Sequence, residues 1–464
     1  MKNSYIRDKI KYKTSSVPKR TKAKIPSLNL SSYNMKSNRN LVKTMEITER
    51  PRKPTFKSKT NCYSTIIYNN PQQVFENLNL PVPAETVLEK FSSYLSKLEK
   101  DEIIELGKIY FLPLNIPKLL VQENHQNFDD KLGNYNLIHG DSLGYRFEIL
   151  EVLGRGSFSQ VCKCLDHRKE EIVAVKIVKS KKKFITQAAT EIRLLENINL
   201  KDIDDTSNII HLKESFTFRG HTCLVFDPFS MNLYQLLKAN SFKGLSQVLL
   251  KKIISQLLAS LKFLKSCHII HGDLKPENVL LKNPESTTIK LIDLGSGCYE
   301  HERIYSYIQA RFYRAPEVLL GIPYTSAIDM WSLGCLVAEM HSATPLFPGN
   351  NEVELMALIQ EVLDTPPAEI INRASKRKIF FDRENRPRLI FDDYGKLIRP
   401  GTLKLEEILK CNDNKFVDFV GRKEYLGCLV WDPKKRMTPE EGLRHEWISE
   451  SQQKKIKAMR EMFK

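Results

Sequence analysis

The sequence predicts an α+β fold, in which a region rich in β-strands is followed by a helical region. Two observations carry this prediction. Alternating apolar residues begin at Tyr145 and indicate a run of strands, interrupted by a turn that contains glycines. An apolar helix with lysines on its outer face is expected from Leu245 to Leu264, and a buried helix is expected to begin near Asp329. With 464 residues, 41% of them hydrophobic, the chain can bury a substantial core.

The net charge of +17 is distributed unevenly. Residues 1–60 contain 17 lysines and arginines against three acidic residues, a net +14, while the remaining chain is close to neutral. This segment has few large apolar residues and cannot bury enough surface to offset its ordering entropy, so we predict a disordered basic tail. Its cluster from Lys9 to Lys24 is compatible with a nuclear import signal, with binding to nucleic acid or an anionic membrane, or with a simply solvated tail.

The nine cysteines show no paired zinc spacing and no disulfide framework, which favours a reducing compartment. The first residues contain no apolar run of signal-peptide length, and no stretch approaches the ~18 apolar residues that span a bilayer. We therefore expect a protein of the cytoplasm, the nucleus or both, without a membrane span. A second basic tail is predicted at 449–464, and the oligomeric state stays open.

Residues 61–145 are predicted to form a small accessory region and a connector. Apolar residues at three- and four-residue spacing from Val87 to Leu98 indicate a helix, whose start is marked by Pro83 and Glu85. A second apolar patch surrounds Tyr110, and a polar connector follows at 123–141.

A glycine-containing turn joins the first two strands of the strand-rich region. Glycines there let backbone N–H groups approach a phosphate without a Cβ clash. On its own this signal is weak, because Ser159 stands where a third glycine is expected. The candidate nucleotide-binding residues of the turn are Leu153, Gly154, Arg155, Gly156, Ser157, Phe158, Ser159, Gln160 and Val161.

Two charged residues strengthen that signal. Lys176 ends the strand Val-Ala-Val-Lys, from which its ammonium can reach phosphates, and Glu191 lies on the next helix, where its carboxylate can pair with the lysine. Farther along, a buried strand ends in a connector that in a two-lobed enzyme would be the hinge. Its backbone at Asp227 and Phe229 could bind a purine edge, and Phe226 would close the space behind the nucleotide.

The chemistry is concentrated between His271 and Gly295. Asp273 can accept a hydroxyl proton and Lys275 can contact a transferring phosphate. Asn278 and Asp293 offer the hard oxygen ligands that Mg²⁺ requires. These types of residue at this spacing point to phosphoryl transfer, in which a protein mainly positions a hydroxyl and neutralises phosphate charge. A buried hairpin with charged turns is the alternative for an isolated Asp-Leu-Gly.

Taken together, the motifs resemble those of a eukaryotic protein kinase over about 147–448. The activation segment, with Tyr305-Ser-Tyr307-Ile-Gln-Ala-Arg-Phe-Tyr-Arg before Ala-Pro-Glu, is similar to that of the dual-specificity tyrosine-regulated kinases. The accessory region resembles the autophosphorylation region of the second class of that family. The resemblance implies a bilobal kinase fold, ATP and Mg²⁺ as cofactors, and phosphorylation of serine and threonine on protein substrates.

The resemblance also assigns regulatory and specificity roles. Tyr307 is expected to be autophosphorylated, and Arg311 and Arg314 to clamp its phosphate, which carries about −1.5 to −2 charges. Glu277 and Glu339 are expected to receive an arginine upstream of the acceptor residue, and Arg311 to favour a proline after it. Gln235, where relatives often carry an acidic residue, weakens the arginine preference. Glu317 and Arg436 are expected to form a buried structural ion pair.

Several departures leave alternatives open. Ser159, Gly272, Leu294 and the hinge Pro228 differ from the common kinase pattern. Ser159 and Leu294 raise the alternative of a catalytically weak scaffold, and Pro228 affects only the detail of adenine binding. Within the enzyme class, the closest alternative is a related homeodomain-interacting or splicing-associated kinase. Nucleic-acid binding is expected only through the basic tail, because no folded binding motif is recognisable.

Overall fold

The computed structural model describes residues 70–115, 128–303, 307–388, 390–392, 395–421 and 427–449. The chain divides into two compact units, 1–67 and 68–464, and all the described residues belong to the second. The predicted basic tail at 1–60, the C-terminal tail from 450 and Tyr305 therefore lie outside the described residues. Within them, no helix combines the length and apolar character needed to cross a bilayer.

The accessory region folds into three short helices and a two-stranded ribbon. Where one helical pattern was expected, the chain breaks into two α-helices. The second starts after Ser96, whose hydroxyl accepts from the Glu99 N–H at 3.2 Å while the Glu99 carboxylate accepts from the Ser96 N–H at 2.7 Å. This capping box is a local start signal that overrides the apolar spacing. The elements are α1 (Pro71–Glu76), β1 (Val82–Pro83), α2 (Ala84–Phe91), the 3₁₀ turn η1 (Ser92–Tyr94), α3 (Lys97–Leu106) and β2 (Lys108–Ile109).

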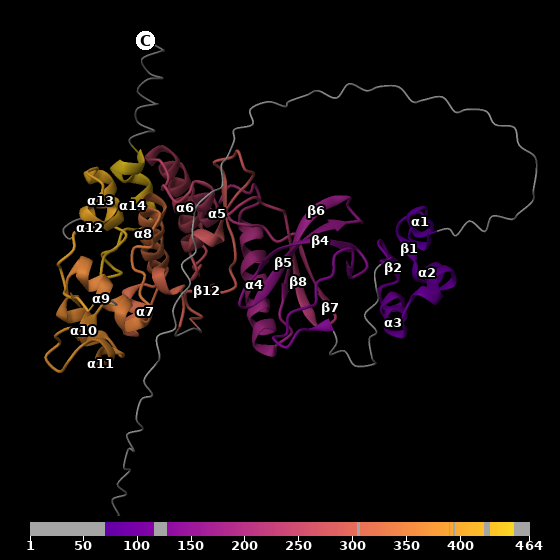
Figure 1. The fold of residues 1–464 in the computed structure, drawn as a ribbon, viewed down its shortest axis with the longest axis horizontal. Coiled ribbons are helices and arrows are strands. Elements are labelled where there is room, and N and C mark those ends of the chain that lie inside the picture. Colours follow the sequence, from indigo (N-terminus) through magenta and orange to yellow (C-terminus); the bar gives the residue numbers. More distant parts are fainter. Residues whose placement is uncertain are drawn as a thin grey trace, which may run out of the picture. The chain divides into compact units, whose positions relative to one another are not determined.

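The small lobe is a six-stranded antiparallel sheet in the order β3-β4-β5-β6-β8-β7, with helix α4 packed beside it (Figure 1). Alternation along β6 separates two cores: Ala174 joins the core that continues into the helical lobe, whereas Val173 and Val175 join the core shared with the accessory region. The elements are β3 (Ser142–Leu143), β4 (Phe147–Arg155), β5 (Ser159–Asp166), β6 (Glu171–Val178), α4 (Lys182–Lys201), β7 (Glu214–Phe218) and β8 (His221–Phe226).

The accessory region is joined to the small lobe by a half-buried polar contact. Glu102 of α3 accepts two hydrogen bonds from the Arg219 guanidinium, at 2.9 and 3.0 Å, and one from the Tyr145 hydroxyl at 2.6 Å. The Arg219 guanidinium also lies 4.0 Å from the centre of the Phe128 ring. Because charge, hydrogen bonds and apolar surface are all satisfied together, this contact ties the accessory region to the sheet.

The larger lobe is helical and is built around α8, which is buried along most of its length and packs against α6 and α13. Two short hairpins, β10–β11 and β13–β14, and a two-stranded antiparallel sheet of β9 and β12 are set among the helices. The elements are α5 (Leu233–Ala239), α6 (Gln247–Ser266), β9 (Ile269–Ile270), η3 (Pro276–Asn278), β10 (Val279–Leu281), β11 (Ile289–Leu291), β12 (Cys298–Tyr299), η4 (Arg311–Tyr313), α7 (Pro316–Leu320), α8 (Ala327–Ser342), α9 (Glu352–Leu363), α10 (Ala368–Arg373), α11 (Arg377–Phe380), β13 (Ile390–Phe391), β14 (Leu397–Ile398), α12 (Leu405–Leu409), α13 (Asn414–Gly421) and α14 (Pro439–Arg444). The predicted two-lobed α+β class is confirmed.

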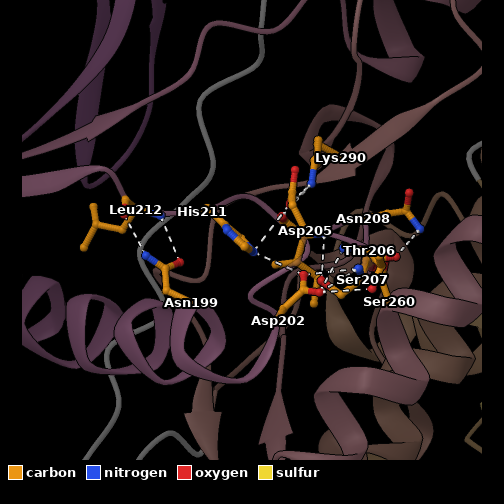
Figure 2. A network of polar contacts seen from close by, with 11 residues as sticks. Asn199, Asp202, Asp205, Thr206, Ser207, Asn208, His211, Leu212, Ser260 and Lys290 are labelled. Carbon is orange, nitrogen blue, oxygen red and sulfur yellow. Dashed lines mark hydrogen bonds and ion pairs between the residues drawn. The ribbon is translucent and has the colours of Figure 1, made fainter.

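The loop between α4 and β7 connects the lobes through a polar network (Figure 2). The Asp202 carboxylate accepts from the N–H of Thr206 at 2.9 Å and of Ser207 at 3.1 Å. The Ser260 hydroxyl of α6 donates to the Ser207 carbonyl at 2.8 Å, so the C-terminal end of α4 is anchored on the helical lobe. Sequence reasoning passed over this loop because its partners lie far along the chain.

Candidate active site

The glycine turn is the hairpin between β4 and β5. The Gly156 N–H donates to the Ser159 carbonyl at 2.8 Å, which closes the turn, and Lys179 Nζ donates to the Ser157 carbonyl at 2.7 Å. A Cβ at Gly154 would meet no protein atom within 4 Å, so no contact of the fold demands glycine there and the backbone is open to an approaching ligand. Ser159 is a buried strand residue and leaves the turn intact.

The other predicted residues of the turn differ in exposure. Leu153 and Phe158 are exposed, and the Phe158 ring packs edge-on against Phe184 with ring centres 5.6 Å apart. Gln160 is buried and its amide donates to the Tyr135 carbonyl. Val161 lies directly opposite Lys176 on the neighbouring strand, so the pairing of β5 with β6 fixes the position of the lysine relative to the turn. Arg155 and Ser157 lie at the exposed end of the hairpin.

Lys176 is the centre of a buried charge cluster. Its ammonium donates to Glu191 Oε1 at 2.7 Å and to Asp293 Oδ1 at 2.7 Å. Burial opposes the ammonium charge, but the carboxylates of Asp293 and Glu191 outweigh it and raise the pKa of Lys176. Burial alone would raise the pKa of Asp293, yet Lys176 lowers it to about 2. The lysine is therefore cationic and Asp293 ionised.

The catalytic candidates meet in the loop between β9 and β10. Lys275 Nζ lies 2.5 Å from Asp273 Oδ2, and Asn278 Nδ2 donates to the same oxygen at 3.1 Å and to the Asp273 carbonyl at 2.8 Å. The other oxygen, Oδ1, accepts from the Ala310 N–H of the activation segment at 3.2 Å. Asp273 is thus oriented by three groups and is only partly buried, as a residue that receives a hydroxyl proton must be.

Asp329 supports this loop from α8, a role that the sequence reasoning missed. Its carboxylate accepts from the backbone N–H of His271 at 2.8 Å and of Gly272 at 2.9 Å. Burial raises the pKa of Asp329, and the two N–H groups oppose this shift. The only sequence signal was its place two residues before Trp331 at the start of an apolar helix.

Gly272 is required by the structure. Its φ of +74° lies in the left-handed region, and a Cβ there would come within 2.6 Å of Ile308 Cδ1. The departure from the arginine found in many kinases therefore follows from close packing of the activation segment. Leu294, another departure, is buried in the main core and keeps an apolar contact.

The hinge follows β8 as expected. Phe226 is buried, whereas Asp227 is exposed and its carboxylate accepts from Lys213 Nζ at 2.6 Å. Phe229 is half-buried against the main core. The side chain of Asp227 is thus held by Lys213 on the exposed side of the hinge.

Tyr307 and its two arginines lie in the activation segment. The Tyr307 side chain is 62% exposed, and the Arg314 guanidinium lies 3.8 Å from the centre of its ring. The polar interaction with Arg314, assisted by the charges of Arg314 and Arg311, lowers the pKa of Tyr307, although burial opposes this shift. Arg311 is exposed. The structure thus brings together the tyrosine and the arginines that the sequence paired.

The two carboxylates expected to select substrates differ. Glu277 is exposed, whereas Glu339 is only 4% exposed and its Oε2 accepts from the Tyr313 hydroxyl at 2.6 Å. Burial raises the pKa of Glu339 to about 7; the Tyr313 hydrogen bond opposes this shift and the charge of Glu277 adds to it. Glu339 therefore already has a partner, which the sequence did not indicate.

Glu317 and Arg436 form the expected ion pair. Arg436 Nη1 and Nη2 donate to the two Glu317 oxygens at 2.7 and 2.9 Å, and both side chains are fully buried. Arg436 also donates to the carbonyls of Ala327 and Val430. This is the bidentate geometry in which an arginine satisfies a carboxylate completely.

The donor set of the loop fits a divalent cation. Asn278 uses its amide nitrogen toward Asp273, which leaves its side-chain oxygen as an acceptor. Asp293 uses Oδ1 toward Lys176 and Gly295, which leaves its other carboxylate oxygen. Two hard oxygens of this kind match the ligands of small divalent ions.

A different group has metal-ligand spacing: among the described residues, Asp202, Asp205 and His211 bring their ligand atoms within 4.8 Å of one another. The Lys290 ammonium contacts the Asp205 carboxylate, and His211 Nε2 lies 3.1 Å from Asp202 (Figure 2). A lysine ammonium thus already faces one of these carboxylates. The group belongs to the network that joins the lobes.

The fold and this site define a eukaryotic protein kinase, and the protein kinase domain family matches residues 147–448. The chain is 46% identical over 371 residues to the human dual specificity tyrosine-phosphorylation-regulated kinase 4, which covers 79% of this chain and 70% of that protein. It is 43% identical over 379 residues to kinase 2 of that name from Drosophila melanogaster, with coverage of 80% and 52%. The probable serine/threonine-protein kinase dyrk2 of Dictyostelium discoideum is 42% identical over 364 residues, with coverage of 78% and 39%.

The chain belongs to the dual-specificity tyrosine-phosphorylation-regulated kinase family and is a dual-specificity serine/threonine protein kinase. The recognition made from the activation segment is confirmed. As a protein kinase it uses ATP and a divalent metal ion. The chain spans about half of the Drosophila relative and less of the Dictyostelium one, so substrates and partners of the whole protein are matters for proposal.

Proposed function

We propose that this kinase transfers the γ-phosphoryl group of ATP to serine and threonine residues of protein substrates, with Mg²⁺ as the divalent ion. One observation carries the proposal: Asp273, Lys275 and Asn278 converge in one loop, and Asp293 is held in an ionised state by Lys176. Asp273 orients the acceptor hydroxyl and takes its proton, while Lys275 offers positive charge to the transferring group.

The remaining groups position the nucleotide. Lys176 is aligned by Glu191 so that its ammonium reaches the phosphates, and the open backbone of the glycine turn covers them. Asn278 and Asp293 would hold the metal ion, which supplies neutralisation of phosphate charge when bound. The complete set of charged groups supports catalysis rather than a scaffold role.

We further propose that Tyr307 is autophosphorylated. Its side chain is exposed enough to be modified, the Arg314 guanidinium lies against its ring, and the charge of Arg311 acts on the same side chain. A phosphate adds about −1.5 to −2 charges, which arginine binds through short, charge-assisted hydrogen bonds.

For substrates, we propose a preference for proline after the acceptor residue, through Arg311, and for arginine upstream of it, chiefly through Glu277. Glu277 is exposed and therefore available to a peptide, whereas Glu339 must exchange its Tyr313 hydrogen bond for a substrate arginine. We also propose residence in the cytoplasm or nucleus, a setting that fits the free state of all eight described cysteines.

The test is intact-mass and phosphopeptide analysis of the parent protein beside Asp273→Asn, both made in bacteria, followed by assay on matched peptides with proline or alanine after the acceptor serine. We expect phosphate on Tyr307 and peptide phosphorylation in the parent alone, with the proline peptide favoured. Absence of both activities from the parent, despite bound ATP and Mg²⁺, would return the protein to the scaffold class.

A further inference from the structure

The arginine beneath Tyr307 already has an anionic partner. Arg314 is 1% exposed, and its Nη1 donates to Glu352 Oε1 at 2.9 Å. Its Nε and Nη2 donate to the carbonyls of Ile308 and Gln309 at 3.0 and 2.9 Å. A cation this deeply buried requires a counter-charge. Among the described residues, Glu352 is the carboxylate that forms an ion pair with it.

The second arginine ends on the same segment of the chain. Arg311 Nη1 donates to the Asn350 carbonyl at 2.6 Å, two residues before Glu352 at the start of α9. Both arginines of the activation segment thus rest on residues 350–352 while Tyr307 is unmodified. This contact joins the activation segment to α9.

Glu352 and Tyr307 compete for one guanidinium. The Arg314 guanidinium lies 3.8 Å from the centre of the Tyr307 ring and its Nη1 donates to Glu352 at 2.9 Å, so the carboxylate and the tyrosine ring both lie against the same cation. A phosphate on Tyr307 would be attracted by Arg314 and repelled by Glu352. The Glu352 carboxylate is therefore favourable next to Arg314 before phosphorylation and unfavourable next to the phosphate afterwards.

We propose that Glu352 is the resident counter-ion of Arg314, which holds the clamp in place before Tyr307 is phosphorylated and is replaced in that role by the phosphate afterwards. This inference rests on the proposed autophosphorylation. Glu352 acts through Arg314 and is a positioning residue. Phosphorylation thereby removes the ion pair between α9 and Arg314.

The proposal makes a directional prediction for Glu352→Gln. In unmodified protein the substitution leaves a buried cation without its counter-charge and lowers stability. In phosphorylated protein it removes a repulsion from the phosphate. Both effects enlarge the stabilisation that phosphate confers. Glu354→Gln is the matched control, because Glu354 lies in the same first turn of α9 but its carboxylate accepts from Asn350 and contacts neither arginine.

The experiment measures melting temperature for the parent, Glu352→Gln and Glu354→Gln, each as autophosphorylated protein and after treatment with a tyrosine phosphatase. Intact mass reports the phosphate on Tyr307. We expect the rise in melting temperature on phosphorylation to be larger by about 2 °C or more in Glu352→Gln than in the parent. Glu354→Gln should match the parent.

Equal rises in all three proteins, or a smaller rise in Glu352→Gln, would overturn the proposal. A parent without phosphate on Tyr307 would instead refute the proposed autophosphorylation. In that case the unmodified proteins still decide the counter-ion role: Glu352→Gln must melt below Glu354→Gln, and equal melting temperatures would exclude it.

Discussion

Two buried ion pairs of this kinase have nearly the same geometry and very different surroundings. Lys176 and Glu191 meet at 2.7 Å in the candidate active site, and Glu317 and Arg436 meet at 2.7 Å inside the helical lobe. The active-site pair has a third member, Asp293, whose side chain is 36% exposed. The pair in the helical lobe is fully buried and is completed by two backbone carbonyls.

The difference lies in the balance of charge. In the active site, two carboxylates share one ammonium. An excess negative charge therefore remains on the side that faces solvent, where it can attract a cation. In the helical lobe one carboxylate meets one guanidinium and every polar atom of the pair is satisfied. A short ion pair therefore indicates a ligand site only where its charge is unbalanced and accessible.

Lys176→Met removes the cation of the active-site ion pair and should abolish most of the activity. We expect loss of about 10²–10³-fold in kcat, because a preorganised cation is removed from the phosphates. Stability should change less than on breaking the other pair, since burial already raises the pKa of Glu191 and the carboxyl can take up a proton. Peptide phosphorylation and thermal melting measure the two effects.

Lys163→Met is the control for that substitution, because Lys163 forms an exposed pair with Glu151 at 3.0 Å on the neighbouring strand. It should retain the parent rate. If Lys176→Met turned over as fast as Lys163→Met, the catalytic role assigned to the Lys176–Glu191 pair would be contradicted.

Glu317→Gln removes the anion of the buried ion pair in the helical lobe and should lower stability. Removing one partner of a fully buried pair leaves Arg436 uncompensated, and we expect a loss of about 3–5 kcal/mol in the free energy of unfolding. Urea denaturation measures it. Glu440→Gln is the matched control: its pair with Lys265 is 2.9 Å long but more than one-third exposed on both sides, and should contribute about 1 kcal/mol or less. Equal losses in the two variants would show that burial does not set the value of such a pair.

Glu339 extends the comparison, because the partner of this buried carboxyl is the Tyr313 hydroxyl, and no cation pairs with it among the residues that the structure describes. Its pKa of about 7 lies above the ordinary value of 4.5, so the neutral form is favoured by folding. This contribution is complete below pH 4.5 and is lost as the pH rises to 7, where the buried group must ionise.

Glu339→Gln keeps an acceptor for Tyr313 without the charge. Its stability relative to the parent should therefore improve by about 2 kcal/mol between pH 4.5 and pH 7.5. Urea denaturation across that range provides the measurement. A stability difference that stays constant with pH would mean that Glu339 does not titrate in this window.

Much of the site could be predicted because its residues belong to short motifs. Asp273, Lys275 and Asn278 lie within six positions, and Lys176 follows a strand pattern, so local spacing alone places the right groups on one loop and one strand. Residues that support the motifs were harder to find. Asp329 contacts a backbone N–H 58 positions away, and Glu352 contacts an arginine 38 positions away, and no local pattern marks either partner.

The sequence by itself determined the two-lobed class, the family and the identity of the reacting groups, because hydrophobic periodicity and motif spacing are properties of neighbouring residues. Tertiary structure alone decided which charges became buried and what each of them faces. It paired Glu339 with Tyr313, excluded a side chain at position 272 and placed Glu352 beneath the tyrosine clamp. Burial and partner choice depend on how distant segments pack, and the pKa and the energy of each charged group follow from that packing.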